Sequence, residues 1–119
     1  MGWRRHEQND FHLAPAERWT TWPDHEPYVP AEFAADGFVH CTAGEALMAR
    51  VANALYRDTP GDFVLLVIDV DALTAPVRWE APAGADLAPL FPHIYGPINR
   101  EAIIEVRRIQ RAADGVFLL

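Results

Sequence analysis

Three histidines fall in short segments whose side chains alternate between polar and apolar types. Because side chains alternate across a β-strand, His40 would share one face with Phe38 and Thr42. By the same rule His12 and His93 would each face away from their apolar neighbours. Imidazole titrates near neutral pH, so a histidine that lines a cleft can give or take a proton there. The pattern predicts one cleft lined by His12, His40 and His93.

Four further polar residues belong to the predicted site. Glu80 closes a predicted strand, where its carboxylate would either orient a catalytic group or remain solvated. Tyr95 shares a strand face with His93, and Asn99 lies four residues later, so both are expected to hydrogen-bond a polar ligand. Thr42 ends the segment that carries the second histidine and has two compatible roles, as a helix cap and as a ligand contact. The spacing of these residues is not that of a compact metal-binding motif, so no metal is expected.

The residue types exclude several kinds of chemistry. The chain contains no Lys and no Ser, so all ten of its basic residues are Arg. Schiff-base formation, P-loop phosphate binding and Ser-His-Asp hydrolysis therefore lack their central residues. The single cysteine, Cys41, follows His40 directly and would point to the opposite face of the strand. We therefore expect Cys41 to be a buried structural thiol and not a nucleophile.

Short strands and two early helices must position these residues. The predicted strands are Asp10–Ala14, Gly37–Cys41, Asp62–Asp69, Pro76–Glu80, Phe91–Gly96 and Ala102–Ile109. The unbroken apolar run in Asp62–Asp69 predicts a strand buried on both faces. A short helix is expected directly after Pro15, and the proline-rich segment 23–36 is expected to be a functional loop. The pattern predicts an α+β domain built on a curved, split, mixed or antiparallel sheet.

The second helix has a clear predicted start. Thr42 and Glu45 form a capping-box pattern, in which each side chain bonds the other residue's backbone N–H, and the helix is expected to continue to about Tyr56. Apolar residues recur at every fourth position and mark its expected buried stripe: Leu47, Val51 and Leu55.

Length and charge limit the organisation of the chain and its partners. The 119 residues suit one domain, expected over 10–119 after a polar extension at 1–9, with a flexible loop at 81–90. A net charge of −7 argues against nucleic acid as the partner and favours a small-molecule ligand, for which a nucleotide remains open. The longest apolar run, 63–68, is too short to cross a bilayer, and no signal peptide is apparent. We therefore expect a cytoplasmic protein without a membrane partner; the oligomeric state is not predicted.

Five segments carry a resemblance to a known family. FHLAPAERW, GFVHCT, LLVID, LTAPVRWE and FPHIYGPIN occur in this order and spacing over residues 10–108. In these segments the chain resembles the DUF952 family of bacterial and plant proteins. That family has no assigned function, so this resemblance implies a fold and a set of site segments but no activity.

A more distant resemblance implies an activity. The order of His12, Trp19, a long loop and His40 before a helix is similar to that of RNA 2′-phosphotransferases and other ADP-ribosyltransferase-like proteins. It implies a small ADP-ribosyltransferase-like fold, with NAD or a related ribosyl ligand bound between two half-sheets. His12 would contact ribose hydroxyls, His40 would lie beside the reacting ribosyl group, and the carboxylate of Glu80, or else Glu101, would stabilise it. The chain departs from that pattern at Leu13, where glycine is common, and no Arg maps onto the phosphate-binding positions.

Several functions fit these residues. The first is ribosyl transfer, with His40, His93 and Glu80 as catalytic residues and NAD as substrate; no other cofactor is expected. The second is a binding module for a nucleotide or other small metabolite without catalysis. The third is a small biosynthetic enzyme that uses histidine acid–base chemistry on an unrelated substrate.

Overall fold

Two antiparallel sheets form the framework of the protein. A computed structural model describes residues 9–81 and 90–119. The four-stranded sheet has the order β3 (Thr42–Ala43), β1 (Asp10–Pro15), β4 (Phe63–Ile68) and β7 (Ile103–Arg108). The three-stranded sheet has the order β2 (Val39–His40), β6 (Phe91–Ile94) and β5 (Val77–Glu80). Every pairing within these sheets is antiparallel, so the predicted α+β class with a split antiparallel sheet is confirmed.

The central strand β4 separates two apolar cores. It pairs with β1 along its whole length and with β7 on its other edge, and all six of its residues are buried, as predicted. Alternate side chains go to opposite faces. One face joins the core that contains Tyr28 and Ile94, and the other joins the core that contains Met48 and Phe117.

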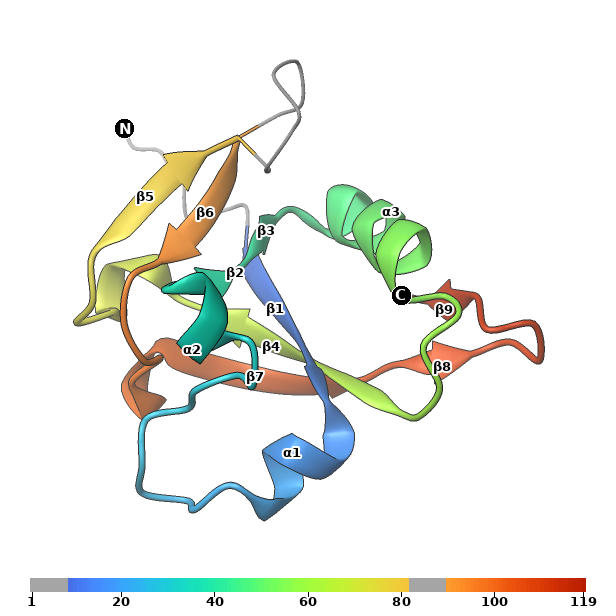
Figure 1. Ribbon diagram of the computed structural model, residues 1–119, viewed down its shortest axis with the longest axis horizontal. Helices are drawn as coiled ribbons and strands as arrows, with labels where there is room; N and C mark the ends of the chain where they lie inside the picture. The colour runs from blue at the N-terminus through green and yellow to red at the C-terminus, as the bar shows by residue number, and fades with distance from the viewer. Residues whose placement is uncertain (1–8, 82–89) are drawn as a thin grey trace.

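In the described residues, three α-helices and two 3₁₀ helices connect the strands. Their bounds are α1 (Ala16–Thr21), α2 (Phe33–Asp36), α3 (Glu45–Leu55), η2 (Val70–Ala72) and η3 (Arg100–Ala102). In Figure 1, α3 and the β5–β6 pair lie on opposite sides of the upper part of β1. The proline-rich segment is more ordered than the predicted loop, because it ends in α2 and Tyr28 bridges to Ile98.

Two predictions about α3 are wrong. Thr42 does not cap the helix: it pairs with Phe11 in the β1–β3 ladder, and the cap position belongs to Gly44 at a φ of 90° without a side-chain hydrogen bond. Strand pairing holds the backbone of Thr42 extended, so the sequence pattern of a capping box is overridden by tertiary structure. The buried residues of α3 are Met48 and Ala52, whereas Leu55, predicted to be buried, is 69% exposed.

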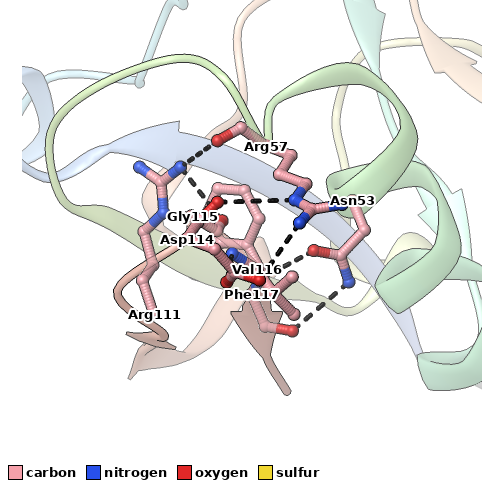
Figure 2. A network of polar contacts seen from close by, with 7 residues as sticks. All are labelled: Asn53, Arg57, Arg111, Asp114, Gly115, Val116 and Phe117. Atoms are coloured by element: carbon pink, nitrogen blue, oxygen red, sulfur yellow. Dashed lines mark hydrogen bonds and ion pairs between the residues drawn. The ribbon is translucent and has the colours of Figure 1, made fainter.

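The last residues form a hairpin that is tied to the loop after α3. Its strands are β8 (Gln110–Arg111) and β9 (Phe117–Leu118), which pair antiparallel in a two-stranded sheet of their own. Arg111 donates hydrogen bonds of 2.7 Å to three backbone carbonyls of that loop: Arg57, Thr59 and Gly61. Asn53 donates to the carbonyl of Phe117 and accepts from its N–H, and Arg57 pairs with Asp114 (Figure 2). The hairpin therefore fixes both the C-terminal half of α3 and the loop that follows it.

Parts of two predictions lie outside the described residues. These are residues 1–8 of the expected polar extension and residues 82–89 of the expected flexible loop. Within the described part of the chain, no helix has the length and apolar character needed to cross a membrane.

Candidate functional site

A cavity of about 520 Å³ opens between the two sheets and α3. All three histidines predicted for the site line it, and so does Thr42. The apolar part of its wall comes from α3 and Tyr56 after it, and from three strands, β1, β4 and β6, through these residues: Phe11, Leu13, Pro15, Met48, Val51, Leu55, Tyr56, Phe63 and Phe91. A volume of this size is typical of small-molecule sites, which are mostly apolar with a few polar groups.

Strand pairing brings two of the histidines together. In the β2–β6 ladder His40 is directly opposite His93, so both side chains lie on one face of the sheet, and their ring centroids are 5.4 Å apart. Phe38 stacks on His93 with centroids 4.1 Å apart and rings inclined by 23°, and its ring is 4.5 Å from that of His40. The aromatic packing restricts the orientation of both imidazoles.

Glu80 orients His93 from the neighbouring strand β5. The Nδ1 of His93 is 2.8 Å from Glu80 Oε1, and the hydroxyl of Tyr95 donates to the same oxygen at 2.6 Å. Hydrogen bonds from Tyr95 and then His93 lower the pKa of Glu80, so its carboxylate is ionised at neutral pH. An ionised carboxylate only accepts, so Nδ1 of His93 carries the proton and Nε2 is the basic nitrogen.

His40 has a carboxylate partner of its own. Its Nε2 is 2.8 Å from Oδ2 of Asp36, which ends α2 four residues earlier in the chain. The short helix and the left-handed Gly37 that follows it, at a φ of 82°, turn the chain so that Asp36 and His40 meet. Two carboxylate–histidine pairs therefore stand side by side at the cavity.

His12 differs from the other two histidines because it is almost fully buried. It is 2% exposed, and its Nδ1 is 2.7 Å from the backbone oxygen of His40. A carbonyl only accepts, so Nδ1 carries the proton. Burial lowers the pKa of His12, and the ring is therefore neutral at pH 7. Its Nε2 is left as a buried acceptor with no hydrogen-bond partner among the described residues.

Comparison with known proteins identifies the family. Residues 13–106 match the family described as "Protein of unknown function (DUF952)". The chain belongs to the DUF952 family. Solved structures of protein CC0527 from Caulobacter crescentus have the same fold as this DUF952 chain. One crystal structure is 24% identical with a TM-score of 0.76, covering 93% of this chain and 94% of that one.

A solution NMR structure of CC0527 agrees with the crystal structure in its likeness to this DUF952 protein. It is 26% identical with a TM-score of 0.71, over 91% of this chain and 90% of that one. Among curated proteins, none matches the chain. The comparisons therefore establish the family and the fold of this DUF952 protein, and they assign it no activity.

Not every predicted residue of the DUF952 chain faces the cavity. Tyr95 and Glu80 do not line the cavity. They are connected to it indirectly, because Glu80 accepts hydrogen bonds from Tyr95 and from His93, and His93 lines the cavity. Asn99 does not line it either: its amide accepts from the N–H of Thr74 and donates to the carbonyl of Ala72. The same amide donates to Glu101, the second candidate for a late carboxylate. The predicted ligand roles of Tyr95 and Asn99 remain predictions, but Asn99 has a clear structural role in this loop.

Sequence reasoning missed two carboxylates of the site. Glu32 and Asp36 both line the cavity, and both come from the proline-rich segment that was singled out for its length alone. The spacing of four residues between Asp36 and His40 was the available signal. Cys41 is buried, as predicted, and burial raises the pKa of its thiol well above the ordinary value. Among the described residues, no group of three or more potential ligands is arranged to hold a metal ion.

Proposed function

We propose that the cavity binds a ribosyl-containing small molecule and that His40 and His93 catalyse transfer of the ribosyl group. The observation that carries this proposal is the pair of carboxylate-bound histidines, His40 with Asp36 and His93 with Glu80, at 5.4 Å from each other. Two imidazoles, each oriented by a carboxylate, supply one group to give a proton and another to take one at neutral pH.

The proposed chemistry is cleavage of a bond from ribose C1′ to a nitrogen base. The C1′–N bond breaks with its electron pair going to the base, and positive charge develops on the sugar. The carboxylates of Glu32 and Asp36, which line the cavity, would stabilise that charge. An acceptor hydroxyl or a water then attacks C1′ and loses its proton to Nε2 of His93. Glu80 accepts the Nδ1 hydrogen bond of His93, so we place it as a positioning residue and not beside the sugar.

We also propose that the fold is ADP-ribosyltransferase-like. Three features support this proposal: two antiparallel sheets with a cavity between them, a histidine on β1, and another on β2, which is followed by β3 and α3. The ligand by this analogy is NAD or a part of it, with His12 toward the ribose.

A binding module without catalysis is the second candidate. The observation in its favour is that Glu80 already accepts two hydrogen bonds and does not line the cavity, so it is not placed to hold a ribose hydroxyl as the late carboxylate of transferases does. His12, with its free acceptor, and the apolar wall from α3 would suffice for recognition.

One experiment separates these candidates. The protein is incubated at millimolar concentrations of NAD, ADP-ribose or nicotinamide riboside, with the melting temperature and nicotinamide release both measured. Release that is lost in His93→Gln and His40→Ala, while the melting-temperature shift persists, supports transfer. A shift without release supports the binding module. Neither a shift nor release with any of the three compounds refutes both. His25→Ala, in an exposed loop, is the control and should behave as the unsubstituted protein does.

A further inference from the structure

Among the described residues, the charged side chains that line the cavity are carboxylates, apart from the histidines. Glu32 and Asp36 line it, and none of its lining residues in the described part of the chain is Arg. The chain has no Lys, so a positive side chain at neutral pH must be an Arg or a protonated histidine. A phosphate or diphosphate is usually held by Arg or Lys, or by free backbone N–H groups.

Three arginines are engaged elsewhere, and Arg78, which is opposite His93 in the β5–β6 ladder, packs over the ring of Tyr95 and does not line the cavity. Arg18 donates through Nε and Nη2 to the carbonyl of Val29, at 3.0 and 2.7 Å. Arg107 pairs with Glu45 at 2.6 Å, and Arg111 is surrounded by backbone carbonyls. Carbonyl oxygens accept the hydrogen bonds of Arg18 and Arg111, and a carboxylate neutralises Arg107. Each of these three arginines would have to give up hydrogen bonds to reach a phosphate.

The start of α3 is also unsuited to an anion. Thr42, just before it, lines the cavity, so the positive end of the helix dipole is the obvious alternative phosphate site. Glu45, however, occupies the first turn of the helix. Its carboxylate offsets the dipole at the position where an anion would bind.

The buried Nε2 of His12 can accept a hydrogen bond from a ligand. His12 Nε2 is an acceptor, 2% exposed as a side chain and unpaired among the described residues. A hydroxyl or amide N–H of a ligand would satisfy it, and a phosphate oxygen would not. Acceptors and carboxylates therefore dominate the cavity, and they match a ligand with hydrogen-bond donors and positive charge.

We propose that the ligand of this cavity is a cationic N-riboside without phosphate, of the nicotinamide riboside class, and that phosphorylated forms of the same riboside are rejected. This inference rests on the proposed function and narrows its substrate class. The pyridinium and the positive charge that develops on the sugar both lie in the field of Glu32 and Asp36, and a 5′-phosphate would be repelled by the same carboxylates.

Three probes that share one pyridinium riboside test this inference. They are nicotinamide riboside, nicotinamide mononucleotide and NAD, and their dissociation constants are measured by calorimetry with the full chain. We expect the riboside to bind at least about tenfold more tightly than the mononucleotide at low ionic strength, and the ratio to decrease as salt screens the carboxylates. Glu32→Gln and Asp36→Asn should each reduce the ratio. Asp71→Asn, which changes an exposed carboxylate that does not line the cavity, should leave it unchanged.

The outcomes separate this inference from the proposed function. If the mononucleotide or NAD binds as tightly as the riboside, or releases nicotinamide as fast, the charge argument is overturned and ribosyl chemistry stands. If Asp71→Asn changes the ratio as much as the two cavity variants do, the site assignment is overturned, because the effect is then one of net charge. If none of the three compounds binds or reacts, both proposals fail.

Discussion

Protonation of His12 should destabilise the folded protein. The ring is buried, its Nδ1–H donates to the backbone of His40, and burial lowers the pKa of the imidazole. In the unfolded chain the pKa is the ordinary value of about 6.5. The unfolded state therefore binds more protons below that pH, and stability is lost as the pH falls through 6.5 toward the lower folded pKa. The loss approaches about 1.4 kcal/mol per pH unit in that window.

The substitution His12→Leu tests this reasoning. At pH 7.5 it should lower the free energy of unfolding by about 1–3 kcal/mol, because the carbonyl of His40 loses its buried partner. At pH 5.5 the cost should shrink by about 1 kcal/mol, since only the unsubstituted protein has a buried imidazole to protonate. Urea unfolding at both pH values gives the two differences. Asp10 titrates in the same range, but it is present in both proteins and its contribution cancels.

The reasoning would be refuted by an equal cost of His12→Leu at the two pH values. That result would mean that the buried ring is already protonated in the fold or exchanges with water freely. His25→Leu, in the exposed loop, is the control and should show no change of its effect with pH.

Three further predictions concern the framework. Arg111→Met should lower the free energy of unfolding by about 2–4 kcal/mol, because five backbone carbonyls lose this donor: Tyr56, Arg57, Thr59, Gly61 and Gly115. Arg108→Met, at an exposed position, should change the free energy of unfolding by less than about 0.5 kcal/mol. Urea unfolding measures both variants, and equal effects would contradict the role assigned to Arg111. Burial raises the pKa of Asp10 from 3.8 to about 6, so an ionised Asp10 destabilises the folded state above that pH. Asp10→Asn should therefore raise the free energy of unfolding at pH 7.5 by up to about 3 kcal/mol, and should not raise it at pH 3. Urea unfolding that shows no gain at pH 7.5 would contradict this reasoning. The Cys41 thiol, whose pKa burial raises, should react with an aromatic disulfide reagent only after unfolding in urea, and a fast reaction of the folded protein would show that the thiol is accessible.

The strand framework of the site could be predicted because strands have a period of two. That rule places His40 on the polar face of its segment and Cys41 among buried residues, and the structure agrees. It also places Phe38 beside His40, where its ring contacts both His40 and His93. These statements need only local geometry, which the sequence encodes directly. The rule is wrong about a polar face for the first strand, because β1 is buried on both faces and His12 is 2% exposed.

Pairing and partner choice could not be predicted in the same way. Thr42 has the pattern of a helix cap, but pairing with Phe11 keeps it in a strand. The contribution of α3 to the cavity also depends on where the helix packs, so Leu55, expected in the core, lines the cavity instead. Asn99 lies in the same FPHIYGPIN segment as His93, but its side-chain amide accepts a hydrogen bond from the N–H of Thr74 and does not line the cavity. In each case a contact between segments that are distant in the sequence determines the role of the residue, and local sequence patterns carry no information about such contacts.

At one of the places where the chain passes from one sheet to the other, a single residue, Cys41, separates β2 from β3. Its N–H bonds the carbonyl of Pro92, and the bond from His12 to the backbone of His40 ties the sheets together beside it. These two bonds hold His40 in place relative to His12 at the junction of the sheets. A ligand that touches both sheets would stabilise this junction, so hydrogen exchange at the Cys41 amide should slow on binding more than exchange within β4.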